Sequence, residues 1–156
     1  MSKVYNLIKP YINTGTLLSP VWTQIKKSTV FTITMNAETE DFDYISDENK
    51  TTEIKAYAPT IPQDISILPG EDDYDYFNEL FHSRPKGTDA HKEVLIVFLK
   101  DVTGSDYRAW KTDAVIKFTD YNAVDGKINL EIGFAGTITD GTVAYTGAVP
   151  SFSPST

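Results

Sequence analysis

The stretch EDDYDYFNELFHSRPKGTDAHKEVLIVFLKD, residues 71–101, decides the fold that the sequence predicts. Its first half predicts a helix over about residues 72–84, because Tyr74, Phe77 and Phe81 recur at helical spacing. Its second half contains the run VLIVFL, which has no polar residue and predicts a strand that is covered on both faces. We therefore expect the helix to pack on a sheet that contains this strand. The predicted helix–sheet core consists of Phe77, Leu80, Phe81, Val94, Ile96 and Phe98.

The remainder of the chain predicts mostly β-structure. Alternating apolar and polar residues indicate strands over residues 28–36, 53–59, 107–119 and 127–138. Residues 60–70, which contain two prolines, predict a connector, and Asp125-Gly126 and Asp140-Gly141 predict turns. Together these elements predict a mainly β fold, a β-sandwich or incomplete barrel with one flanking α-helix.

A length of 156 residues predicts one domain with one core. We expect an apolar N-terminal arm over residues 1–27, which packs on its own core or on a neighbouring subunit. A β domain is expected over residues 28–149, followed by a flexible tail over residues 150–156. The acidic segment 37–52 predicts a long loop between two strands, and loops of that length in small domains are usually functional or mobile.

Composition limits the classes of function. The net charge of −8 argues against tight binding of nucleic acid, because phosphate contacts need clustered lysine and arginine. No cysteine is present, so the chain has no disulfide framework and no thiolate metal site, which fits a reducing cytoplasm. No run of apolar residues is long enough to span a bilayer and no signal peptide is visible, so we expect no membrane association.

Recognisable catalytic and metal-binding motifs are missing from the sequence. His82 and His91 are the only histidines, and they lack the spacing of a metal pair. The runs DFD at 41–43 and DYD at 73–75 resemble the start of a calcium loop, but neither has the required glycine and glutamate further on. We therefore expect no enzymatic activity, no cofactor and no metal ion.

Two other functions stay open from the residues alone. One is a monomeric β-sandwich module that binds carbohydrate or protein through exposed tyrosine and tryptophan. The weaker one is a small hydrolase that uses the carboxylates of Asp113 and Glu131, which would have to converge at a suitable separation.

Two stretches resemble the major tail protein, or tail tube protein, family of long-tailed bacteriophages. They are TTEIKAYAPTIPQDISILPGEDDYDYFNELFHSRPKGTDAHKEVLIVF, residues 51–98, and AWKTDAVIKFTDYNAVDGKINLEIGFAGTITDGTV, residues 109–143. The family pattern is a strand, a proline-containing connector, an acidic turn, an aromatic helix of the form DYxYFxxLF, a polar break and an apolar strand. Tube proteins of contractile tails and of type VI secretion systems share this fold, so the resemblance leaves a tube protein of such a system open as an alternative.

The resemblance implies a structural virion protein of phage tail-tube-like fold, whose hexameric rings stack into a hollow tube that conducts DNA without binding it specifically. It implies further copies of the chain and other tail proteins, such as tape measure and tail-end proteins, as partners. It implies a location in the virion tail, after assembly in the cytoplasm of the host bacterium. Residues 28–59 match the family's extended hairpin, whose loop reaches the next ring. The inter-ring candidates are Glu40, Asp41, Asp43, Tyr44, Asp47 and Glu48.

A closed ring of this kind must line its channel with one face of a sheet. We expect that face to carry the polar residues that alternate with core residues, because a lumen rich in carboxylates would keep DNA mobile. The lumen candidates are Glu53, Lys55, Asn129 and Glu131. Their neighbours Ile54, Ala56, Leu130 and Ile132 are expected to point into the subunit.

Overall fold

The computed structural model describes residues 8–16, 18–26, 32–46, 48–147 and 149–155. Within these ranges the chain forms nine strands, one α-helix and one 3-10 helix. The strands are β1 (Ile8–Asn13), β2 (Trp22–Gln24), β3 (Ala37–Phe42), β4 (Thr51–Tyr57), β5 (Thr60–Ser66), β6 (His91–Thr103), β7 (Asp106–Asn122), β8 (Lys127–Thr146) and β9 (Val149–Pro154). The helices are α1 (Asp72–Ser83) and the 3-10 helix η1 (Gly87–Ala90).

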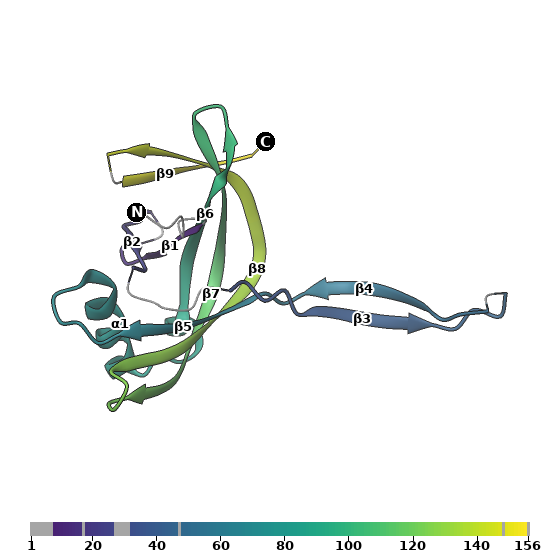
Figure 1. Cartoon of the computed structure of the whole chain (residues 1–156), viewed down its shortest axis with the longest axis horizontal. Coiled ribbons are helices and arrows are strands. Elements are labelled where there is room, and N and C mark those ends of the chain that lie inside the picture. The colour runs from purple at the N-terminus through teal and green to yellow at the C-terminus, as the bar shows by residue number, and fades with distance from the viewer. Residues whose placement is uncertain (1–7, 17, 27–31, 47, 148, 156) are drawn as a thin grey trace, which may run out of the picture.

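Seven of the strands form one antiparallel sheet that curves around the body of the protein (Figure 1). Its strand order is β2-β1-β6-β7-β8-β5, with β9 also paired to β8. The first part of β8 pairs with β5 and its last part pairs with β9, so this 20-residue strand runs through the whole body. The architecture confirms the predicted mainly β fold, an incomplete barrel with one α-helix beside it.

Strand β6 is covered on both faces, as its apolar run predicts. The alternate residues Val94 and Ile96 belong to one buried cluster, which includes Phe77 of α1. Leu95 and Val97 belong to a second cluster on the other face. The second cluster is completed by Tyr11, Ala109 and Val143. The curved sheet therefore encloses two cores, and only the first is covered by the helix.

The second core ends at a pair of tyrosine hydroxyls. The Tyr11 and Tyr145 oxygens lie 3.0 Å apart and share a hydrogen bond. Burial raises the pKa of both hydroxyls, and Tyr145 is raised further by its bond to Tyr11. Both groups therefore stay protonated at neutral pH, and their hydrogen bond ties β1 to the end of β8.

The residues of α1 are buried to different depths. Phe77 is completely buried, whereas Leu80 and Phe81 are half-buried at the edge of the first core. The Phe81 ring lies 5.4 Å from the Phe118 ring and 5.4 Å from the Tyr121 ring. Helix α1 ends at Ser83, and Arg84 then takes a left-handed backbone with φ of 50°. Of the other predicted core residues, Val94 and Ile96 are buried and Phe98 is half-buried.

Three expectations about connections were wrong. The predicted connector 60–70 contains strand β5, whose Ile61 and Ile65 are buried and whose proline is tolerated because β5 lies at the sheet edge. Asp140-Gly141 is no turn, since β8 continues through it. Gly141 instead allows β9 to pass closely, because an added Cβ would lie 2.3 Å from the Ser153 carbonyl oxygen. The predicted flexible tail also forms most of β9, from Val149 to Pro154.

The N-terminal half also differs from expectation. The arm contributes β1 to the interior of the sheet, between β2 and β6, so its described part packs on its own core. Residues 28–31 of the predicted strand 28–36 lie outside the described residues, and residues 32–36 form only a single bridge, between Thr34 and Thr60. The predicted loop 37–52 begins with strand β3, because threonine and alternating carboxylates can pair when both faces of a ribbon meet water.

Candidate self-assembly hairpin

Strands β3 and β4 form a two-stranded hairpin of their own, which projects from the body (Figure 1). The strands pair antiparallel, with Glu40 opposite Glu53 and Phe42 opposite Thr51. Every described side chain of the hairpin strands is exposed except those of Phe42 and Thr51, which are half-buried. The hairpin therefore lacks the packing that usually stabilises a sheet, and an isolated two-stranded ribbon of this kind is only marginally stable in water.

Neither face of the hairpin is a conventional apolar face. One face carries Glu40 and Lys55, whose charged atoms lie 4.0 Å apart and are well exposed. The other face carries Asp41, whose carboxylate accepts a hydrogen bond of 2.8 Å from the Thr52 hydroxyl, and Ile54, which is 54% exposed. A pair of exposed charges contributes little to stability. The ribbon is thus held mainly by its backbone hydrogen bonds.

The hairpin tip, residues 43–50, combines carboxylates with large apolar side chains. Tyr44 is 48% exposed and Ile45 is completely exposed. The Phe42 and Tyr44 rings stack with centroids 5.7 Å apart. The tip sequence DYISDENK contains three acidic residues and one lysine. Exposed apolar side chains gathered at the end of a projecting ribbon are typical of a protein–protein contact.

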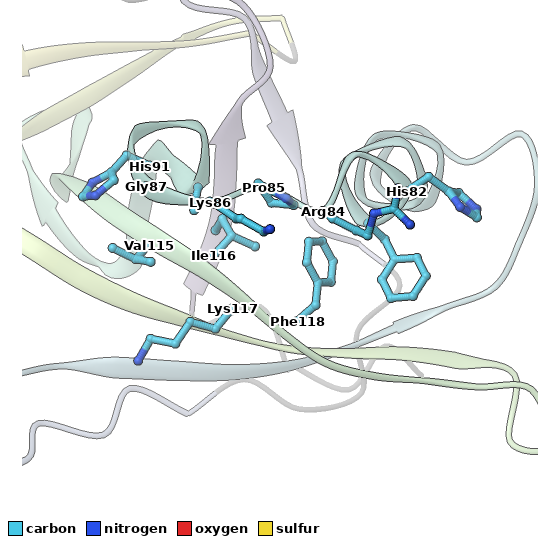
Figure 2. Close-up of a pocket in the computed structure, with 12 residues that line it drawn as sticks. His82, Arg84, Pro85, Lys86, Gly87, His91, Val115, Ile116, Lys117 and Phe118 are labelled. Carbon is cyan, nitrogen blue, oxygen red and sulfur yellow. The ribbon is translucent and has the colours of Figure 1, made fainter.

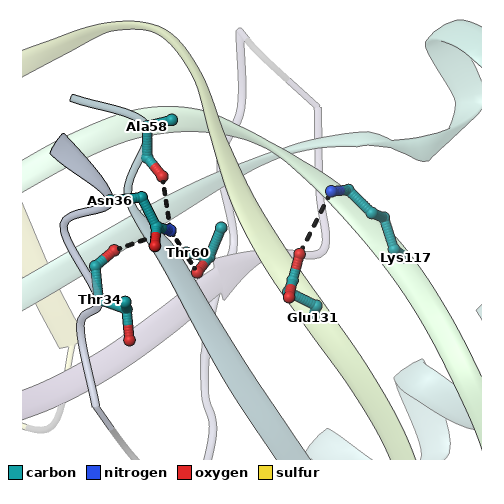
Figure 3. A network of polar contacts seen from close by, with 6 residues as sticks. All are labelled: Thr34, Asn36, Ala58, Thr60, Lys117 and Glu131. Atoms are coloured by element: carbon teal, nitrogen blue, oxygen red, sulfur yellow. Dashed lines mark hydrogen bonds and ion pairs between the residues drawn. The ribbon is translucent and has the colours of Figure 1, made fainter. Parts of the chain in front are cut away.

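A neck of residues 34–36 and 58–60 joins the hairpin to the body (Figure 3). The backbones of Thr34 and Thr60 exchange two hydrogen bonds of 2.9 Å. Asn36 has φ of 48°, a left-handed conformation that asparagine tolerates better than most residues. Its side-chain amide donates hydrogen bonds to the Ala58 carbonyl oxygen at 3.0 Å, to the Thr60 hydroxyl oxygen at 3.1 Å and, more weakly, to the Thr34 carbonyl oxygen at 3.5 Å. Asn36 therefore fixes the direction in which the chain leaves the body.

We expect substitution of Asn36 to loosen the hairpin. Asn36→Gly keeps the left-handed backbone but loses all three amide hydrogen bonds, whereas Asn36→Ala also incurs a backbone strain of about 1–2 kcal/mol. Hydrogen–deuterium exchange of the β4 amides should therefore be faster in the glycine variant than in the parent chain and fastest in the alanine variant. Equal protection in all three proteins would show that the neck does not control the hairpin.

The described inter-ring candidates lie in the hairpin tip and in the part of β3 that leads to it. Glu40 and Asp41 lie on β3, while Asp43, Tyr44 and Glu48 lie in the tip. Asp47 lies outside the described residues. Sequence reasoning missed Asn36, although an asparagine after an alternating run is a signal for a left-handed turn.

The lumen candidates are not brought together. Glu53 and Lys55 lie on the projecting hairpin, and their neighbours Ile54 and Ala56 are exposed instead of pointing into the subunit as expected. That expectation was wrong because alternation on β4 reflects two solvated faces and not a core face. The alternation of polar and apolar residues on β4 therefore does not distinguish a face that lines a channel from a face that lies in the core.

The other two lumen candidates lie on β8 in the body. Glu131 forms an ion pair of 3.2 Å with Lys117 of β7, and the Asn129 amide donates a hydrogen bond of 2.7 Å to the Asp120 carboxylate. Leu130 and Ile132 beside them are buried in the first core. The polar residues of this part of β8 thus form cross-strand contacts on the face opposite that core.

The described residues show no group typical of a metal site, and the two carboxylates considered for hydrolysis lie apart in the sheet. None of the described His, Asp and Glu side chains form a group of three that could hold a metal ion. Asp113 lies four residues along β7 from Lys117, the partner of Glu131. At roughly 3.3 Å per residue, the backbones of Asp113 and Glu131 lie about 13 Å apart or more, and the Glu131 carboxylate is paired with Lys117. No helix among the described residues is long and apolar enough to cross a membrane.

Comparisons with known proteins find similarity among solved structures. No protein-family model matches the chain, and no curated protein matches it. Among solved structures, a chain of the sheath/tube terminator of PVC, an extracellular contractile injection system, in the extended state is 14% identical with a TM-score of 0.49, over 90% of this chain and 96% of that chain. A chain of the anti-feeding prophage baseplate is 7% identical with a TM-score of 0.45, over 90% and 95% of the two chains. A chain of the anti-feeding prophage tube terminating cap is 13% identical with a TM-score of 0.49, over 91% and 92%. Similarities at this level do not establish a family for the chain.

Proposed function

We propose that the chain is a structural subunit that self-assembles into stacked hexameric rings and so forms the tube of a bacteriophage-type tail. The observation that carries this proposal is the β3–β4 hairpin, a ribbon exposed on both faces that ends in exposed Tyr44 and Ile45. A ribbon of this kind gains stability when another chain covers it. Further copies of the same chain are the simplest source of that cover.

The edges of the main sheet support self-assembly as well. The path of strands ends at β2 on one side and at β5 on the other, and unpaired edge strands are templates for another chain. A contact between two unlike edges of identical subunits is heterologous, and it closes into a ring when the rotation per subunit allows it. Ring formation would therefore cover the edges of β2 and of β5 beyond Thr60, which no described strand covers.

The acidic balance and the sequence resemblance support a tube that conducts DNA. A net charge of −8 gives the chain a field that repels phosphate, so a duplex would pass without being held. The resemblance of residues 51–98 and 109–143 to tail tube proteins supports the same assignment. The proposal includes no enzymatic activity, places the assembled protein in the tail of the virion, and leaves Glu53, Lys55, Asn129 and Glu131 as lumen predictions.

The test is assembly of the purified chain over a range of concentrations and salt conditions. We expect size-exclusion chromatography with light scattering to show oligomers, and electron microscopy to show rings and stacked tubes. Rings that never stack would contradict the tube and retain only ring formation. A strict monomer under all conditions, with or without other tail proteins, would contradict the proposal and favour a monomeric binding module.

A further inference from the structure

A groove of about 800 Å³ lies between the C-terminal end of α1, the 3-10 helix η1 and the middle of β7 (Figure 2). Much of its lining is apolar and comes from all three of these elements and the link between the two helices. The apolar residues are Phe81, Pro85, Ala90, Val115, Ile116 and Phe118. A hollow of this size could take two or three large side chains of another segment.

The same groove has a basic rim. Arg84, Lys86 and Lys117 line it together with the histidines at 82 and 91, and none of the described aspartate or glutamate side chains does. Lys117 is paired with Glu131 at 3.2 Å, whereas Arg84 and Lys86 form no ion pair with any described residue. On a chain with a net charge of −8, this is a local concentration of positive charge that attracts an acidic partner.

The hairpin tip has the complementary chemistry. It presents exposed Tyr44 and Ile45 for an apolar groove, and its sequence has three acidic residues against one lysine for a basic rim. Matching of both apolar surface and charge is what fixes the register of a specific contact.

We propose that the hairpin tip of one copy docks in the α1–β7 groove of a second copy. Tyr44 and Ile45 fill the apolar lining, and the carboxylates of Asp43 and Glu48 lie beside Arg84 and Lys86. This inference rests on the proposed self-assembly and names the surface that receives the hairpin.

The position of the two surfaces on one subunit favours a contact between copies. The hairpin and α1 lie at opposite ends of the long axis of the molecule (Figure 1). The six residues of β3 alone carry the tip about 20 Å away from the neck, away from the helix. Because the two surfaces differ and lie at opposite ends, each copy can bind one neighbour through its tip and another through its groove. Such a contact can extend an assembly indefinitely.

Engineered cysteines test the docking directly, because the parent chain has none. Full-length chains with Ile45→Cys and with Lys86→Cys are mixed under assembly conditions and oxidised. We expect a disulfide-linked dimer of the two variants. The control pairs Ile45→Cys with Lys100→Cys, an exposed position on β6 outside the groove lining, and should give little cross-linking.

Charge reversal gives a second readout. Arg84→Glu with Lys86→Glu should raise the concentration needed for assembly roughly tenfold, because two attractive contacts become repulsive. Adding Asp43→Lys and Glu48→Lys to the same chain should restore assembly. The matched control, Lys100→Glu with Arg108→Glu, changes the net charge equally at exposed positions outside the groove lining and should assemble normally.

The outcomes separate this inference from the function on which it rests. The docking surface is wrong if tubes form but Ile45→Cys and Lys86→Cys do not cross-link. It is also wrong if charge reversal in the groove does not weaken assembly, or if charge reversal in the tip does not restore it. Self-assembly itself would stand in each of these cases. Failure of the parent chain to assemble under any condition overturns both. Cross-linking together with rescue by the tip reversal supports the docking as stated.

Discussion

Removing most of the β3–β4 hairpin should leave a folded subunit that no longer forms tubes. Glu40 and Glu53 are opposite each other in the ribbon, so residues 41–52 can be replaced by Asn-Gly, which forms a tight hairpin turn. Because β3 and β4 lie outside both buried clusters, the midpoint of thermal unfolding should change little. Electron microscopy should show monomers or single rings where the parent chain gives tubes.

The control for this deletion keeps the length of the ribbon. A chain with Thr39→Ser and Thr52→Ser retains the backbone pairing, the tip and the hydroxyl that bonds Asp41, and it should assemble like the parent. Tubes of normal length from the shortened chain would show that the hairpin is no assembly contact. A large fall in the unfolding midpoint would instead show that the hairpin stabilises the body.

Replacing Phe77 with alanine should lower the free energy of unfolding by about 3–5 kcal/mol. Phe77 is completely buried in the first core, which also contains Val94 and Ile96 of β6. The loss is a large share of the roughly 5–15 kcal/mol that stabilises a typical domain. Urea unfolding monitored by circular dichroism should show a lower midpoint with an unchanged slope.

Phe81→Ala is the matched comparison on the same helix. The sequence alone predicted Phe81 as a core residue, but it is half-buried at the helix end and its ring contacts lie at the edge of the core. Its removal should therefore cost clearly less than removal of Phe77. Equal losses for the two variants would contradict this ranking of their burial, and an unaffected Phe77→Ala variant would contradict the packing of α1 on the sheet.

The parts of the fold that were predictable are those in which one residue pattern has one physical explanation. The run Val94–Leu99 had to lie between two apolar layers, and the structure places alternate residues in two cores. The Asp125-Gly126 turn follows from residues that favour tight hairpins. The helix was predictable because its aromatic residues recur at helical spacing over several turns.

The parts that were missed have patterns with two explanations. Pro62 suggested a connector but lies on an edge strand, where the missing N–H is not needed. Gly141 suggested a turn but makes room for β9 beside a continuing strand. The polar segment of β3 suggested a loop, because no apolar face marks a ribbon that projects into water. The groove was not predictable, since its lining comes from α1, η1 and β7, which only the fold brings together.

The length of β8 has a consequence for the time at which the protein can fold. Its first part supplies Ile128, Leu130 and Ile132 to one core, and its last part supplies Val143 to the other. Neither core is complete until residues 127–146 have left the ribosome, after strands β1 to β7 and the helix have already emerged. The pairing of β5 with β8 also joins segments that are far apart in sequence, and such pairings form slowly. Until β8 emerges, the nascent chain therefore carries β5 without its partner strand and both cores without the residues that β8 supplies.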